Sequence, residues 1–198
     1  EGEAGGGGGG GGGRAGRASG GGGGGGYKLA DLGNGCWRDH KFTDDIQTRQ
    51  YRCPEVILGQ GYDTASDVWS AACVVFEAAV GDVLFNPRAG KRWSRDEDHL
   101  ALMVELLGRM PRKLSASGTH AKDFFNKTGE LRNIKKLKPW GLADVLADKY
   151  DFARAEAQAL ADFILPMLDF DPSKRATAAQ MLAHPWLSEA APALDECD

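Results

Sequence analysis

The 198-residue sequence predicts one mainly α-helical domain behind a glycine-rich segment. Most of the 28 glycines fall in residues 1–26, a stretch without apolar periodicity that buries too little surface to offset the entropy of ordering it. Beyond it, apolar residues recur at helical spacing between capping residues and glycines, and only Tyr27–Ala30 reads as a strand. We therefore expect a disordered segment 1–26, a folded region 27–188 and a tail 189–198.

The first long helix is expected after a loop. Residues 34–63 mix charged residues, Gly and Pro, which favours a loop with at most short helical turns. Thr64 and Asp67 then form a capping-box pattern that opens a helix to Val80, and Gly81 is a natural stop. Apolar residues cover nearly the whole circumference of this helix, which predicts that it lies at the centre of the core.

A second capping box, Ser94 with Glu97, predicts a helix that runs to Leu107 and ends at Gly108. His99 follows this box directly and is expected at the surface. The long connection 109–150 is expected to hold a short helix over 144–147. Two further helices complete the predicted domain, one over Ala153–Leu168 and one from Thr177, where Gln180 closes a third capping box, to just before Pro185.

Composition excludes several classes of protein. The net charge of −4 is carried by the folded region, which argues against nucleic-acid binding through a basic face and leaves room for a basic protein partner. The four cysteines show no CxxC spacing, so neither a zinc site nor a disulfide framework is expected, as in a reducing compartment. No apolar run is long enough to span a bilayer, so we expect no membrane partner.

Four motifs follow one another in a fixed order. Asp31-Leu32-Gly33 alone is more often an ordinary turn. It becomes informative because three further motifs follow it in order. These are Cys53-Pro54-Glu55, Asp67-Val68-Trp69-Ser70 and LDFDPSKRATAAQMLAHPWL at 168–187. This ordered set resembles the C-terminal lobe of a eukaryotic protein kinase, with Leu32 for Phe in the Asp-Phe-Gly motif and Cys53 for Ala in the Ala-Pro-Glu motif.

Three longer stretches narrow the resemblance. DIQTRQYRCPEVILGQGY, SRDEDHLALMVELLG and FFNKTGELRNIKKLKPWGLADVL are similar to the SR-protein kinases, which phosphorylate serines in the Arg/Ser repeats of splicing factors. The connection 109–150 resembles the insert of the wider CMGC group of kinases. The resemblance implies ATP and Mg²⁺ as cofactors and Arg/Ser-rich proteins as partners. It also implies a location in the cytoplasm and the nucleus.

The resemblance assigns roles to several residues. Asp31 would hold Mg²⁺ against the phosphates of ATP, because Mg²⁺ prefers hard carboxylate oxygens. Glu55 would pair with Arg175 and so tie the end of the activation segment to the last helices. Gly33 and Asp67 would be structural, and Asp67 would cap its helix or accept backbone hydrogen bonds.

Two further sets of charged residues would bind substrate by resemblance. The basic set would surround a phosphorylated serine, and its members are Arg49, Arg52 and Arg95. The acidic set would form a docking groove for arginine-rich segments with one lysine at its edge, and its members are Asp82, Asp98, Glu105 and Lys149. On spacing alone, Asp98 and Glu105 share one stripe of a helix and favour a solvated acidic face instead.

The parts of a kinase that precede the Asp-Phe-Gly position are missing from residues 1–30. A phosphate-covering Gly-rich loop, a strand Lys, its Glu partner and a catalytic-loop His-Arg-Asp all belong there. Polyglycine does not replace the Gly-rich loop, and no His or Asp precedes Asp31. We therefore expect this chain alone to be inactive and assign no catalytic base. The alternative is a non-catalytic docking module that binds basic Arg/Ser peptides or a partner kinase.

Overall fold

The structure is a computed structural model that describes residue 28 and residues 30–190. It divides into two units, residues 1–35 and 36–198, each of which is described by itself. The predictions for segment 1–26, for two residues of the strand (Tyr27 and Leu29) and for the tail from 191 lie outside the described residues. Lys28 and Ala30 are described and are not in a strand.

Regular structure in the described part of the second unit is helical, apart from one antiparallel bridge between Phe125 and Leu131. The prediction of a mainly α domain is therefore confirmed. The elements in chain order are the 3-10 helix η2 (Arg49–Tyr51), α1 (Pro54–Leu58), α2 (Ala65–Val80), α3 (Arg95–Leu107), α4 (Arg112–Ser115), α5 (Ala121–Phe124), α6 (Leu142–Tyr150), α7 (Arg154–Ile164), the 3-10 helix η3 (Leu165–Leu168), α8 (Ala178–Leu182) and α9 (Pro185–Ala190).

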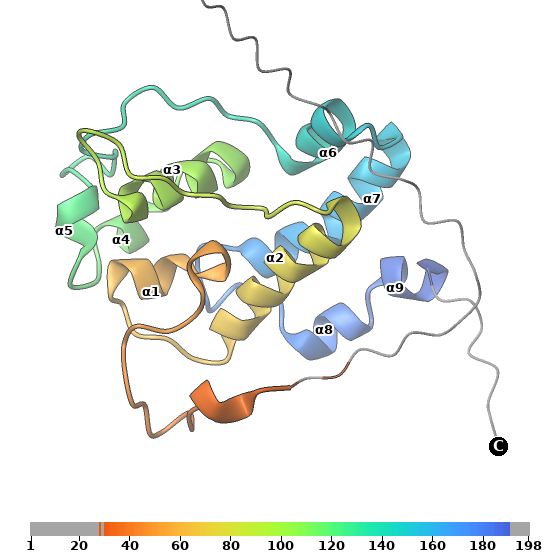
Figure 1. Ribbon diagram of the computed structural model, residues 1–198, viewed down its shortest axis with the longest axis horizontal. Helices are drawn as coiled ribbons and strands as arrows, with labels where there is room; N and C mark the ends of the chain where they lie inside the picture. The colour runs from red at the N-terminus through yellow and green to blue at the C-terminus, as the bar shows by residue number, and fades with distance from the viewer. Residues whose placement is uncertain (1–27, 29, 191–198) are drawn as a thin grey trace, which may run out of the picture. The chain divides into compact units, whose positions relative to one another are not determined.

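Helix α2 crosses the middle of the second unit (Figure 1). It contacts η2 on one side and α7 with η3 on the other, while α3, α4 and α5 lie together at one end of the view. The expected loop 34–63 contains only short helical elements, of which α1 is the longest at five residues. The helix expected over 153–168 is present as α7, and it tightens into η3 where Pro166 removes a backbone donor.

The start of α2 differs from the prediction. Thr64 has helical dihedral angles and its side chain makes no capping hydrogen bond. The carboxylate of Asp63 instead accepts from the Ala65 N–H at 2.8 Å, so the cap lies one residue earlier than expected. The end of the helix is as predicted, because Gly81 closes it in the left-handed conformation with φ +76°.

Helix α2 is not buried on all sides. One face is buried and carries Trp69, Cys73 and Phe76. The opposite face is exposed along Asp67, Ala71, Val74 and Ala78, and the exposed fraction of Val74 is 52%. The predicted place of α2 at the centre of the core therefore holds for one face only, because an apolar pattern does not say whether a neighbour covers it.

Helix α3 begins with half of the predicted capping box. The hydroxyl of Ser94 accepts from the Glu97 N–H at 3.1 Å. The Glu97 carboxylate does not return to Ser94, because it is buried and accepts from both the backbone and the side-chain nitrogens of Asn133, each at 2.7 Å. These two bonds fix the connection 109–150 against α3.

The same connection also forms hydrogen bonds with the end of α1. The Thr119 and His120 N–H groups donate to the carbonyls of Gly59 and Leu58 at 3.2 and 3.0 Å. Gly118 allows this approach, since a Cβ added there would lie 2.2 Å from the Leu58 carbonyl oxygen and its φ is +94°. The connection is more helical than expected, because α4 and α5 were not predicted and α6 spans nine residues rather than the four over 144–147.

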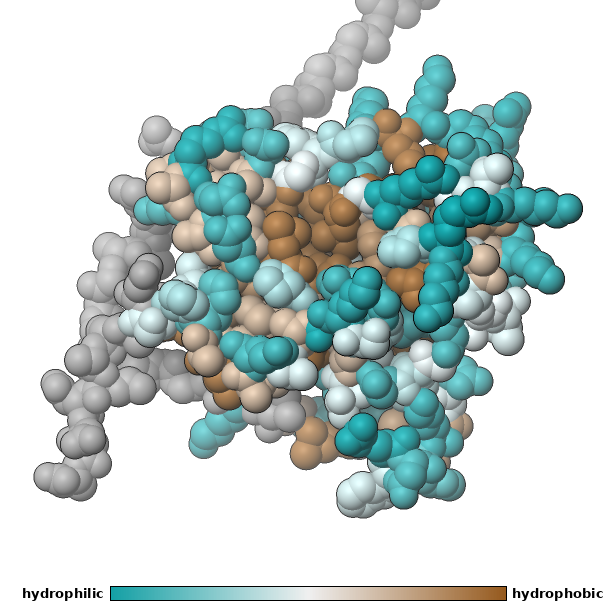
Figure 2. Space-filling view, turned by 180° about the vertical axis from the view of Figure 1, so that it is seen from behind, coloured by the Kyte–Doolittle hydropathy of each residue, from teal (hydrophilic) through white to brown (hydrophobic). Residues whose placement is uncertain are grey.

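An aromatic cluster joins α2 to α3. Trp69 stacks on Phe85 with centroids 6.0 Å apart, and Phe85 lies 5.4 Å from the ring of His99. His99 is fully buried, so its expected place at the surface is wrong. No helix in the described part is long and apolar enough to cross a bilayer. One face of the molecule gathers apolar side chains in its middle, framed by hydrophilic ones (Figure 2).

Candidate functional site

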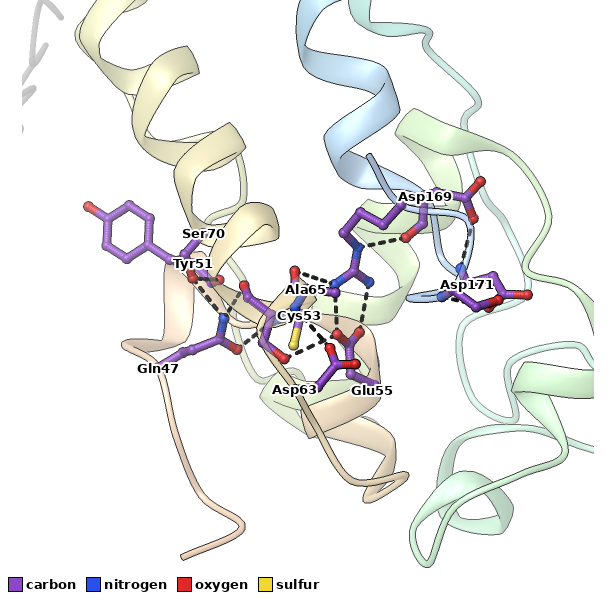
Figure 3. A network of polar contacts seen from close by, with 12 residues as sticks. Gln47, Tyr51, Cys53, Glu55, Asp63, Ala65, Ser70, Asp169 and Asp171 are labelled. Atoms are coloured by element: carbon purple, nitrogen blue, oxygen red, sulfur yellow. Dashed lines mark hydrogen bonds and ion pairs between the residues drawn. The ribbon is translucent and has the colours of Figure 1, made fainter. Parts of the chain in front are cut away.

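The predicted pair of Glu55 and Arg175 lies at the centre of a buried network (Figure 3). The guanidinium makes two parallel bonds to the carboxylate, at 2.7 and 2.9 Å, and both side chains are almost fully buried. Arg175 also donates to the carbonyls of Ala65 and Asp169, and its guanidinium lies 5.1 Å from the centre of the Trp69 ring. One ion pair thus ties α1, the start of α2 and the segment after η3 together.

Sequence reasoning missed Gln47, which holds the segment before α1 on α2. Its amide nitrogen donates to the Ser66 carbonyl at 2.8 Å and to the Ser70 hydroxyl at 2.7 Å. Its amide oxygen accepts from the Cys53 N–H at 3.0 Å. Gln47 adopts φ +68°, an unusual angle for a residue other than Gly. No local sequence pattern signals this role, because Ser66 and Ser70 lie 19 and 23 positions further along the chain.

Two members of the predicted phosphoserine-binding set follow Gln47, one at the start of η2 and one just after it. Arg49 pairs with the carboxylate of Asp96 on α3, and Arg52 pairs with Asp45 at 2.9 Å and donates to the Gln47 carbonyl. Arg95, the first residue of α3, is exposed and precedes Asp96 in the chain. Two of the three arginines are therefore already bound to carboxylates, Arg49 to Asp96 and Arg52 to Asp45.

A cavity of about 320 Å³ opens beside this basic set. Arg52 lines it together with Asp45, Asp96, Tyr62 and His120. Because carboxylates share the wall with the guanidinium, an incoming phosphate would compete with Asp45 and Asp96 for the arginines.

The predicted docking residues fall into two groups. In the first, Asp82 follows the end of α2 and meets the last turn of α6. The Tyr150 hydroxyl donates to its carboxylate at 2.9 Å, and the Lys149 ammonium lies 3.4 Å from the same oxygen. The hydrogen bond from Tyr150 and the charge of Lys149 together lower the pKa of Asp82 below its ordinary value.

The second docking group lies on α3. The Asp98 carboxylate accepts from the Arg88 N–H at 2.8 Å, and the Glu105 carboxylate accepts from the Lys138 N–H at 2.7 Å. Each acid thus anchors a loop on one side of the helix. The structure records no direct bond between the two groups within residues 36–188.

Asp31 belongs to the first unit. It is exposed, has φ +57° and precedes the 3-10 helix η1 (Leu32–Asn34). Its carboxylate fits the part of one ligand to Mg²⁺, which proteins bind through one or two carboxylates and substrate phosphates. The described residues contain no group of three or more His, Cys, Asp and Glu side chains that could hold a metal. Asp31 therefore fits a contribution to a Mg²⁺–ATP site rather than a complete one.

Comparisons with known proteins identify the family of the chain. The protein kinase domain family matches residues 22–187. The chain therefore belongs to the protein kinase family. It is 55% identical over 84% of its length to the serine/threonine-protein kinase SRPK of Physarum polycephalum, 53% over 83% to protein kinase dsk1 of Schizosaccharomyces pombe, and 52% over 81% to human SRSF protein kinase 3. Within the family, it is of the SRPK type.

The aligned part of the chain spans between 28% and 39% of the length of these three relatives. The matched region contains the Glu55–Arg175 pair, the three arginines and all four docking residues.

Proposed function

We propose that this chain is part of a serine/threonine kinase that transfers the γ-phosphoryl of ATP to serines in Arg/Ser-rich proteins. The observation that carries the proposal is the identity above 50% to SRPK-type kinases over more than four fifths of the chain. A role in the regulation of mRNA splicing, and a location in the cytoplasm and the nucleus, belong to the same proposal.

Several charged residues have defined tasks in this function. Asp98 and Glu105 bind the guanidinium groups of an unmodified repeat, since a carboxylate matches the planar fork of arginine. Arg49, Arg52 and Arg95 bind a serine that is already phosphorylated. Asp31 supplies one carboxylate to Mg²⁺, which neutralises charge on the phosphates of ATP when bound.

We further propose that the 198 residues by themselves transfer no phosphate. Positioning and electrostatics supply almost all of kinase catalysis, and the sequence before Asp31 offers no His-Arg-Asp and no interspersed Gly-rich loop. The same feature favours the second candidate function, a docking module that binds basic Arg/Ser peptides without catalysis.

Peptide binding tests the substrate class. Asp98→Asn with Glu105→Gln removes both charges but keeps an oxygen that can accept from the Arg88 and Lys138 N–H groups. We expect this variant to bind an unphosphorylated Arg/Ser peptide about 3- to 10-fold more weakly, from two partly exposed charge pairs. Fluorescence anisotropy of the full chain at low salt measures the change.

The matched control is Glu156→Gln with Asp162→Asn, which removes two exposed charges from α7. Equal binding by both variants would show that the acids on α3 are only a solvated face. A second assay incubates the chain with labelled ATP, Mg²⁺ and the peptide. Binding without turnover is the expected result, whereas turnover that Asp31→Ala abolishes would overturn the proposal that the chain alone is inactive.

A further inference from the structure

The loop between α2 and α3 ends in a concentrated basic turn. Its residues Arg88, Lys91, Arg92 and Arg95 carry four positive charges within eight positions, and all four are exposed. We refer to residues 88–95 as the basic turn. It ends at Arg95, the first residue of α3, where the chain reverses direction (Figure 1). A cluster of this kind stands out in a chain whose net charge is −4.

Backbone contacts hold the basic turn in place at both ends. The Arg88 N–H donates to the Asp98 carboxylate at 2.8 Å, and the Ser94 hydroxyl accepts from the Glu97 N–H. In the middle, the Gly90 N–H donates to the Trp93 carbonyl at 3.1 Å, and a Cβ at Gly90 would lie 2.3 Å from the Trp93 ring. The turn is therefore an ordered surface rather than a free loop.

The acids nearest to the turn do not neutralise it. Three carboxylates follow in the first turn of α3, but Asp96 pairs with Arg49, Glu97 is buried against Asn133, and Asp98 accepts from a backbone N–H. Within the described part of the chain, the four basic side chains form no ion pair or hydrogen bond. Their charge is available to an anionic partner.

We propose that the basic turn is a second anion-binding subsite, which takes further phosphoserines of a partly phosphorylated Arg/Ser segment. This proposal rests on the proposed function. The turn ends at Arg95, and the next residue, Asp96, pairs with Arg49, so the turn continues directly into the predicted phosphoserine pocket. One phosphoserine carries a charge of about −1.5 to −2 at pH 7, so a further phosphoserine matches the cations that the turn adds before Arg95, which are Arg88, Lys91 and Arg92.

The spacing of serines in an Arg/Ser repeat also fits a basic turn that follows a phosphoserine pocket. In an extended peptide, every second side chain points the same way and such residues lie about 7 Å apart. An Arg/Ser repeat therefore presents a row of serines on one side. Once several are phosphorylated, a single pocket cannot neutralise the row, whereas a pocket followed by a basic turn can. Phosphorylated product would be retained here.

Binding of a doubly phosphorylated Arg/Ser peptide by the full chain tests the proposal. Lys91→Ala with Arg92→Ala should weaken this binding about 3- to 10-fold at low salt, because each exposed charge pair contributes modestly. The difference should shrink as salt screens the charges. The matched control, Lys122→Ala with Lys136→Ala, removes two exposed lysines from the connection between α3 and α6 and should bind like wild type. Circular dichroism checks that both variants keep their helices.

The proposal is overturned if the two variants bind the phosphorylated peptide equally well. It is also overturned if vesicles with anionic lipid, or a single-stranded RNA, bind the basic turn while the phosphopeptide does not. Its failure is distinguishable from that of the proposed function. Suppose that Lys91→Ala with Arg92→Ala weakens binding of the phosphopeptide, while the double variant of the two acids on α3 binds the unmodified peptide as before. The anion-binding subsite would then stand, and the proposed docking of the substrate on α3 would be refuted.

Discussion

The bond between Glu55 and Arg175 is a bidentate ion pair between two almost fully buried side chains. Its two side chains come from motifs 120 positions apart, and the sequence predicted them as partners only through resemblance. The sequence did not show that both side chains are buried. A pair with this little exposure is costly to break, because the residue left behind keeps an uncompensated charge inside the protein.

Arg175→Met is expected to reduce the free energy of unfolding by about 3–5 kcal/mol, since it leaves the Glu55 carboxylate buried without its partner. Glu55→Gln combined with Arg175→Met should cost less than Arg175→Met alone, because no charge then remains inside. Urea denaturation of the full chain measures both.

The control for this pair is Arg154→Ala, which removes the exposed bridges to Asp144 and Asp148 and should cost no more than about 1 kcal/mol. Equal losses from Arg175→Met and Arg154→Ala would mean that the buried pair adds little to stability.

His99 is the residue for which sequence reasoning was furthest from the structure. Its ring is fully buried beside Phe85, and neither ring nitrogen has a hydrogen-bond partner among the described residues. Burial, reinforced by the positive charge of Arg49, lowers its pKa from 6.5 to about 4, although Asp96 opposes the shift. His99 is therefore neutral at pH 7.

The low pKa of His99 gives a pH dependence with a defined sign. Between pH 6.5 and 4 the unfolded chain takes up a proton at His99 and the folded chain does not, so stability falls as the pH falls. The loss reaches on the order of 3 kcal/mol near pH 4. Denaturation at pH 7, 6 and 5 should show this slope in wild type and a smaller slope in His99→Leu. Equal slopes in both proteins would contradict a buried neutral histidine.

At the scale of elements, one capping pattern has three outcomes. At Thr177 the box with Gln180 forms in full, as predicted. At Ser94 only half of it forms, because Glu97 finds a buried partner in Asn133. At Thr64 none of it forms, because the cap moves to Asp63. The sequence could predict where helices start, but not which acids tertiary partners would recruit.

The contact between α1 and the connection 109–150 depends on Gly118. Gly118→Ala should cost about 3 kcal/mol, because the new Cβ meets the Leu58 carbonyl and the left-handed backbone is strained. Gly61→Ala is the matched control. Its φ is also positive, at +80°, but nothing lies within 4 Å of its Cβ position, so it should cost only about 1–2 kcal/mol. Thermal or urea unfolding measures the difference, and equal costs would show that the close approach adds nothing.

At the scale of the whole molecule, the sequence predicted the mainly α class and all the long helices, because periodicity and glycine stops are local signals. It did not predict which apolar side chains stay exposed. Besides Val74, these include Trp37 and Phe42 before η2 and Trp140 before α6. Figure 2 shows that apolar side chains also gather in the middle of one face. Exposed apolar area of this kind favours association, because contact with a partner removes it from water.

The long span between Glu55 and Arg175 also sets an order of events during synthesis. The chain leaves the ribosome from its N-terminus, so the α1 carboxylate emerges well before its guanidinium partner. Until position 175 is available, Glu55 must stay hydrated, and α1 cannot settle against α2 in its final position. Forming this pair closes a loop of 120 residues, and such a long-range contact forms slowly relative to a helix. Nascent chains that stop before Arg175 would remain open at α1 and accessible to chaperones.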